Sequence, residues 1–211
     1  RTMKTSIKAP DYGYAEYIQK ALLSEEECYE CTQFIMSECS RLQNMAYQLL
    51  DMALLRREEM KDSNCSVKAL FKESQKVMHV RASQKKIRLR YVLSQNYVVR
   101  GNMEQLLILI NNLIDNAIKA SRQKDEIRIC AYAEESAVVV EVKDHGTGME
   151  VEQISHIKEA FYRVDKARSR AAGGAGLGLA ICERIVQIHH ADMSFISEPG
   201  VGTIVKLSFP V

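Results

Sequence analysis

The sequence predicts an α+β protein in which a helical hairpin at 1–62 precedes a two-layer α/β sandwich at 63–211. Residues 14–60 contain neither proline nor glycine, as expected of long helices. The remainder alternates short apolar runs, typical of strands, with longer helical patterns. Glycine-containing turns near 144–148 and 173–178 interrupt this second region. The change in texture near residue 62 therefore predicts a domain boundary.

Composition places the chain among ordinary globular proteins. Of its 211 residues, 46% are hydrophobic and 27% are charged, with a formal net charge of +2. That charge gives no reason to expect nucleic acid or an anionic membrane as a partner. No apolar run approaches the roughly 18 residues that span a bilayer, and no signal peptide is recognisable. The six cysteines form no disulfide framework, which favours a reducing compartment.

The helical region contains a start signal and an apolar seam. Ser24 followed by Glu27 forms a capping box, so a long helix is expected to begin there, after a short helix. In the long helix, apolar residues recur at alternating spacings of three and four: Leu42, Met45, Leu49 and Met52. Such a seam must be buried against other helices, and a homodimer that forms a four-helix bundle achieves this economically. The alternative is a hairpin packed against its own second domain.

The second region is expected to form a mixed sheet with helices on one face. A half-buried strand is predicted around Ile87, Leu89 and Tyr91, and residues 97–100 are predicted as its short partner. Helices are predicted at 67–83, 103–122 and 177–189, and strands at 127–133, 137–143, 192–196 and 203–209. Most of these strands follow one another closely, so hairpin connections are expected.

The helix at 103–122 has two contrasting faces at about 100° per residue. One side is apolar: Met103, Leu106, Ile110, Leu113 and Ala117. The opposite side carries Asn112, Asn116 and Lys119. Amide oxygens can bind a hard cation and an ammonium group can bind a phosphate, although a solvated polar face is the plain alternative. Asparagine is a poor helix former, so two asparagines at this spacing indicate a functional role.

Two glycine turns favour a nucleotide as the ligand. Asp144 precedes Gly146 and Gly148 at the end of a predicted strand, where a flat ligand can approach the backbone closely. A buried carboxylate there can accept a hydrogen bond from the amine of adenine. The run from Gly173 to Leu179 leads into a helix, whose free N–H groups and positive end suit a polyphosphate.

These motifs together resemble those of bacterial sensor histidine kinases, members of a wider group that includes gyrase, Hsp90 and MutL. The segment Asn112-Leu-Ile-Asp-Asn116-Ala-Ile-Lys119 resembles the N box, and Asp144-x-Gly146-x-Gly148 the G1 box. Residues 161–165 resemble the F box, and Gly174-Ala-Gly176-Leu177-Gly178-Leu the G2 box, with alanine where threonine is usual. Gly202-Thr203 matches the final glycine motif. The resemblance covers residues from about 35 to 211 and implies a dimerisation hairpin followed by an α/β sandwich of the histidine-kinase ATPase type.

The resemblance also implies roles for individual residues. Asn116 would coordinate Mg²⁺ that bridges the phosphates of ATP, and Asn112 would line the same side. Lys119 and Arg163 would contact phosphate oxygens. At the other end, Asp144 would hold the adenine amine, with Thr203 and Tyr162 nearby. The surrounding turns would be formed by Gly146, Gly148, Gly174, Gly176, Leu177 and Gly178, and the segment 163–174 would be a mobile lid.

Position 112 bears on the reaction that these residues perform. ATPases of the wider group, by resemblance, carry a glutamate here that activates water, whereas an asparagine amide has no useful basicity. Slow hydrolysis and transfer to another acceptor are therefore expected. Catalysis would consist of positioning and charge neutralisation by Asn112, Lys119, Arg163 and Mg²⁺.

The acceptor motif of the family is incomplete here. Its histidine opens a His-Glu-x-(Arg/Lys)-Thr-Pro sequence, yet the first histidine of this chain is His79. Met3-Lys4-Thr5 and Gly13-Tyr14-Ala15 resemble pieces of the region. We expect the acceptor to lie outside the chain or to be altered, a response regulator to be the onward partner, and the chain to be the cytoplasmic part of a sensor that upstream segments anchor in a membrane.

Three hypotheses follow for function. The first is the kinase core of a two-component sensor, which binds Mg-ATP and passes the γ-phosphoryl group to a histidine and then to an aspartate of the regulator. The second is a nucleotide-binding regulatory module without kinase activity, which the incomplete acceptor motif favours. The third is a gyrase-like or Hsp90-like ATPase, which Asn112 argues against.

Overall fold

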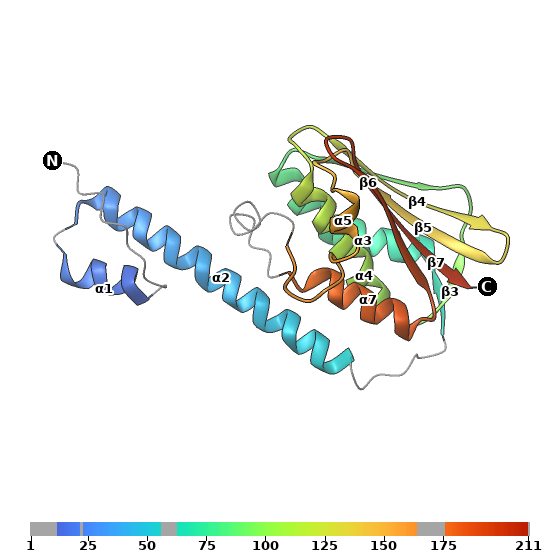
Figure 1. The fold of residues 1–211 in the computed structure, drawn as a ribbon, viewed down its shortest axis with the longest axis horizontal. Coiled ribbons are helices and arrows are strands. Elements are labelled where there is room, and N and C mark those ends of the chain that lie inside the picture. Colours follow the sequence, from blue (N-terminus) through green and yellow to red (C-terminus); the bar gives the residue numbers. More distant parts are fainter. Residues whose placement is uncertain (1–11, 22, 56–62, 164–175, 211) are drawn as a thin grey trace.

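A computed structural model describes residues 12–21, 23–55, 63–163 and 176–210 of the chain (Figure 1). A short helix α1 (Tyr12–Lys20) precedes the long helix α2 (Glu25–Leu55). The predicted capping box at the start of α2 is confirmed. The backbone N–H and the hydroxyl of Ser24 donate to Glu27 Oε2 over 2.9 and 2.8 Å, and the N–H of Glu27 donates to Ser24 Oγ over 3.3 Å.

The predicted seam on α2 does not behave as one surface. Met45 is half-buried and packs against the core of the second domain, as the alternative prediction required. Leu42 and Leu49 remain 47% and 45% exposed. The side chain of Met52 lies outside the described part of the structure. The second half of α2 contacts α7, so the helix is only partly open to a further partner.

A five-stranded mixed sheet forms one layer of the second domain. Its order is β2 (Arg88–Leu93), β4 (Glu126–Glu134), β5 (Ala137–Lys143), β7 (Gly202–Pro210) and β6 (Asp192–Glu198). Only the β2–β4 pair is parallel; the other three pairs of neighbours in this sheet are antiparallel. Helices α3 (Val67–Gln84), α4 (Met103–Ala120) and α7 (Gly178–Ile188) form the second layer, on one face of the sheet (Figure 1). The predicted two-layer α+β fold is confirmed.

Two short elements differ from the prediction. Strand β3 (Val98–Arg100) pairs with β1 (Asn64–Ser66) and not with β2, so the expected partnership within residues 87–100 is wrong. Three-residue strands carry too little periodicity to reveal their partners. A one-turn helix α5 (Val151–Ile154) follows the first glycine turn and was not expected from the sequence.

The core lies between the sheet and helix α4. Alternate residues of two neighbouring strands are buried there, as the period of two requires: Ile127, Ile129, Ala131, Val138, Val140 and Val142. The predicted apolar stripe of α4 meets them, with Leu106, Ile110, Leu113 and Ala117 buried and Met103 partly buried. This packing fixes the opposite, polar edge of α4 beside the turns that end the strands.

His189 links the end of α7 to the start of α4. Its Nε2 accepts a hydrogen bond from the backbone N–H of Asn102 over 3.1 Å, and its Nδ1 donates to the carbonyl of Ile185 over 2.8 Å. The side chain of Asn102 caps α4 by accepting from the N–H groups of Glu104 and Gln105. Within the described residues, no helix is both long and apolar enough to cross a membrane.

Candidate functional site

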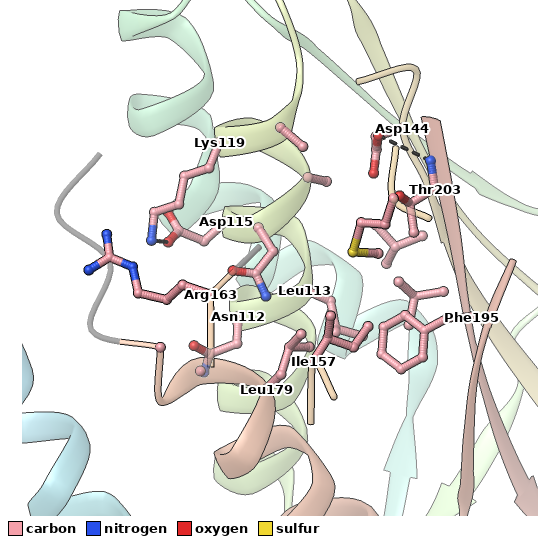
Figure 2. Close-up of a pocket in the computed structure, with 18 of the residues that line it drawn as sticks. Asn112, Leu113, Asp115, Lys119, Asp144, Ile157, Arg163, Leu179, Phe195 and Thr203 are labelled. Carbon is pink, nitrogen blue, oxygen red and sulfur yellow. Dashed lines mark hydrogen bonds and ion pairs between the residues drawn. The ribbon is translucent and has the colours of Figure 1, made fainter. Parts of the chain in front are cut away.

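A cavity of about 280 Å³ opens between α4, the sheet and the turns that precede α5 and α7 (Figure 2). Ten of the residues predicted for the nucleotide site line it: Asn112, Asn116, Lys119, Asp144, Gly148, Tyr162, Arg163, Gly176, Gly178 and Thr203. Gly146 and Leu177 are not among the lining residues, and Gly174 lies outside the described part of the chain. Segments nearly a hundred residues apart in the sequence therefore meet in one place.

Asp144 lies at one end of the cavity, where β5 runs into the first glycine turn. Its Oδ1 accepts hydrogen bonds from the N–H of Gly146 over 2.8 Å and from that of Thr203 over 3.3 Å. Both hydrogen bonds found among the described residues fall on Oδ1, which leaves Oδ2 for a ligand. Burial raises the pKa of this carboxyl, while the two N–H groups act in the opposite direction.

The backbone of the first glycine turn requires glycine. Gly148 has a φ of 61°, and a Cβ there would lie 1.9 Å from the carbonyl oxygen of Glu198. Gly146 is wedged against the backbone of Ala120, where a Cβ would come within 2.6 Å. Gly146 thus positions the turn and supplies an N–H to Asp144 without facing the cavity. The part of Gly146 in holding a ligand stays a prediction.

The polar edge of α4 forms a second wall of the cavity. The Nδ2 group of Asn112 donates back to the carbonyl of Ile108 over 2.9 Å, and its Oδ1 lies 2.9 Å from where a Cβ of Gly178 would be. Asn116 is half-buried one turn further along. Lys119 Nζ lies 2.7 Å from Asp115 Oδ2, which holds its ammonium group beside the cavity. The side chain of Asn112 therefore lies in the contact between α4 and α7.

Arg163 and Tyr162 close the cavity on the side of the second glycine turn. The Nε and Nη2 groups of Arg163 are buried and have no hydrogen-bond partner among the described residues. Just before them, Phe161 has a φ of 68° and its N–H donates to the carbonyl of Gly176 over 2.8 Å. Phe161 and Gly176, which flank the predicted lid, therefore meet, and residues 164–175 lie outside the described part.

The structure adds residues that the sequence did not single out. The middle of the cavity is apolar and formed by Leu113, Ala117, Val142, Met149, Ile157, Leu179, Phe195 and Val205. Asp115 was missed, although its spacing of four from Lys119 was visible in the sequence. Gln48 of α2 also lines the cavity, and nothing in the sequence pattern predicts this approach of a distant helix.

The arrangement suits a ligand with a flat apolar body and a negatively charged tail. Figure 2 shows Asp144 and Thr203 at one end, with Phe195 below them, and Lys119 and Arg163 at the other end, with Leu113 between the two ends. The buried Nε and Nη2 of the Arg163 guanidinium group require acceptors, which phosphate oxygens provide. Among the described residues, no group of three or more His, Cys, Asp and Glu is placed to hold a metal. A magnesium ion here would depend on Asn116, water and the ligand's own phosphates, which is its usual preference.

Comparison with known proteins agrees with this geometry. A family model described as "Histidine kinase-, DNA gyrase B-, and HSP90-like ATPase" matches residues 101–211. The chain belongs to this family. The matched residues contain α4, both glycine turns and the whole described cavity except Gln48. Membership of the histidine kinase-like ATPases therefore rests on the same residues that build the site.

Among histidine kinase-like ATPases, sensor kinases resemble the chain over its helical part as well. The sensor protein SrrB of Staphylococcus aureus is 30% identical over 203 residues, which are 94% of this chain and 35% of that protein. The chain thus spans little more than a third of the length of the curated relatives it matches. The histidine kinase AdeS of Acinetobacter baumannii superimposes with a TM-score of 0.74 at 17% identity, covering 95% of this chain and 92% of that one. ThkA in complex with the response regulator TrrA gives 0.76 at 19% identity, covering 95% and 56%.

Proposed function

We propose that the chain is the cytoplasmic kinase core of a two-component sensor histidine kinase, which binds Mg-ATP in this cavity. The phosphoryl acceptor would be a histidine, and an aspartate of a response regulator would receive the group next. The observation that carries the proposal is the placement of one free carboxylate oxygen and one unpartnered guanidinium group at opposite ends of an apolar cavity. Adenine, ribose and polyphosphate present the complementary groups in that order.

At the adenine end, Asp144 would discriminate the base. Its Oδ2 can accept a hydrogen bond from the exocyclic amine of adenine, and guanine presents a carbonyl oxygen at the equivalent position. Thr203 Oγ1 lies 2.8 Å from Ser197 Oγ, so a hydroxyl pair stands beside the carboxylate. These groups can hold water against the base edge. Val142, Met149 and Phe195 would cover the faces of the ring.

At the phosphate end, Lys119 and Arg163 would neutralise the charge of the triphosphate. Asn116 would supply an amide oxygen to Mg²⁺, which contributes charge neutralisation between the phosphates when it is bound. The first turn of α7 begins at Gly178, where free backbone N–H groups favour an anion. These residues position and stabilise the transferred group and need no covalent chemistry of their own.

Asn112 supports transfer to a side chain in preference to hydrolysis. Its amide donates to Ile108 and abuts Gly178, so it has neither the basicity nor the freedom to activate water. ATP held in this way would wait for an acceptor that another part of the kinase presents. Solved relatives agree in kind: ShkA was determined in complex with AMPPNP and ThkA in complex with a response regulator.

A calorimetric titration with ADP and ATP in the presence of Mg²⁺ tests the nucleotide part of the proposal. Heat of binding is expected with both nucleotides, together with slow release of phosphate from ATP. The absence of heat with either nucleotide would refute the proposal. Fast turnover would instead indicate an ATPase of the gyrase or Hsp90 kind.

A nucleotide-binding regulator without kinase activity is the second candidate, because the cavity by itself would serve nucleotide binding without transfer. Placing a His-Glu pair ahead of α1 and following the transfer of label from ATP separates the two candidates. Labelled histidine supports the kinase core. Nucleotide binding without any label on the chain supports the regulator.

A further inference from the structure

One of the residues that line the cavity comes from the helical region. Gln48 on α2 lines the same cavity as Asn112 and Arg163, although the family match begins only at residue 101. The second half of α2 lies along α7, and Met45, three residues before Gln48, packs against the core. The contact is therefore part of a wider interface between the helix and the ATP-binding domain.

Gln48 lacks a hydrogen-bond partner where it enters the cavity. Its Oε1 is buried and, among the described residues, accepts from no donor. The Nε and Nη2 groups of Arg163 are in the same condition in the same cavity. Burying a polar group without a partner is costly, so unpaired groups on two separate elements point to a ligand that satisfies both.

The position of α2 indicates which part of a ligand Gln48 would meet. In Figure 2 the pale blue ribbon of α2 enters at the lower left, on the side of Arg163 and Lys119 and away from Asp144. A triphosphate provides acceptors for the guanidinium group and for the amide NH₂ of Gln48. Water held on a magnesium ion provides a donor for Oε1.

We propose that Gln48 is a nucleotide-contacting residue, which α2 contributes to the phosphate end of the cavity. The inference rests on the proposed function, because it takes Mg-ATP to be the ligand. It has a thermodynamic consequence. Since the contact exists only when α2 is packed on the ATP-binding domain, nucleotide binding and this packing must favour each other to the same extent.

Substitutions in the full chain test the proposal. Gln48→Leu removes the amide and retains most of the side-chain volume, and Gln43→Leu is its control, since Gln43 is exposed on the same helix. Affinity for Mg-ATP is measured by calorimetry, affinity for AMP by displacement, and folding by thermal unfolding. We expect Gln48→Leu to raise the Kd for Mg-ATP about tenfold, as the loss of a hydrogen bond to a charged ligand does. In Gln48→Leu the Kd for AMP should stay unchanged, and the Tm should stay unchanged or rise. Gln43→Leu should match the native chain in all three quantities.

Each other outcome has a definite meaning. An unchanged Kd for Mg-ATP in Gln48→Leu, with the native chain binding normally, would overturn the inference and leave the proposed function intact. An equal loss of affinity for Mg-ATP and AMP, or a lowered Tm, would overturn it as well, because Gln48 would then act through structure alone. Failure of the native chain to bind any nucleotide would refute the proposed function itself.

Discussion

At Asp144, burial and hydrogen bonding act on the same carboxylate in opposite directions. The residue is 5% exposed, and burial raises its pKa, while the N–H groups of Gly146 and Thr203 stabilise the charged form. A folded-state pKa above the unfolded value means that the folded chain holds this proton more tightly. The contribution of Asp144 to the free energy of unfolding is therefore lost when the pH rises through the raised pKa. A carboxylate buried at a cost in stability agrees with the proposed role of Asp144 in binding the nucleotide.

The substitution Asp144→Asn separates those two effects. The amide of the variant keeps an acceptor for the two backbone N–H groups but presents an NH₂ group where the adenine amine would bind. We expect the affinity for Mg-ATP to fall about 100-fold, because a charge-assisted hydrogen bond becomes a clash of two donors. The free energy of unfolding at pH 8 should be unchanged or increased. Calorimetry and chemical denaturation measure both quantities, and the exposed Asp192→Asn is the control.

A marked loss of stability in Asp144→Asn, with nucleotide affinity retained, would show that the carboxylate is structural. That result would contradict the assignment of the adenine end.

At the scale of elements, helix α4 joins the core to the site. Its apolar stripe packs on the sheet, its cap residue Asn102 contacts His189 of the α7 end, and its polar edge faces the cavity. Burial lowers the pKa of His189, because the ring is enclosed and Nε2 must remain unprotonated to accept from Asn102. The neutral form of His189 therefore stabilises the contact between the end of α7 and the start of α4.

The pH dependence of stability tests this contact. In the unfolded chain His189 takes up a proton at about pH 6.5, whereas in the folded chain it does so only at lower pH. The free energy of unfolding that this histidine contributes is therefore lost as the pH falls from about 6.5 toward the lowered pKa. We expect His189→Gln to reduce the change in the free energy of unfolding between pH 7.5 and about pH 5. His156→Gln, at an exposed position paired with Glu159, is the control.

Identical pH profiles for the native chain and His189→Gln, from urea denaturation at each pH, would contradict the role given to the histidine.

Much of the architecture could be predicted from local pattern. The two faces of α4 follow from a period of 3.6, and Asp144 and Gly148 follow from a turn that only glycine can form. What could not be predicted depends on tertiary contact. The pairing of β1 with β3 has too few residues for a pattern. Gln48 and Phe195 reach the cavity only because distant elements pack there, and Gly146 turns away because it meets the backbone of Ala120.

At the scale of the molecule, the helical region remains unusually apolar on its surface. Large apolar side chains of α2 are more than 40% exposed: Tyr29, Met36, Leu42, Tyr47, Leu49 and Leu50. A surface of this kind indicates a binding face. Helix α2 also contacts α7, so a second copy of the chain would pack on the apolar side chains that this contact leaves exposed. Homodimerisation through the hairpin is our proposal for this face.

The oligomeric state in solution tests that proposal. The native chain is expected to be a dimer by light scattering coupled to size-exclusion chromatography. Leu42→Asp combined with Leu49→Asp should yield monomers, because two carboxylates would be buried in the interface. Glu30→Asp, at an exposed position of the same helix, should remain dimeric. A monomeric native chain at micromolar concentration would contradict the proposal.

In the proposed function, the cavity binds Mg-ATP with adenine at Asp144 and the phosphates at Arg163. Competition between ATP and GTP for the native chain, measured by calorimetry with Mg²⁺, tests it most directly. ATP is expected to bind, and GTP to bind at least about tenfold more weakly, since guanine presents a carbonyl oxygen where adenine presents its exocyclic amine to the free carboxylate oxygen. Equal affinities, or no binding of ATP, would contradict it.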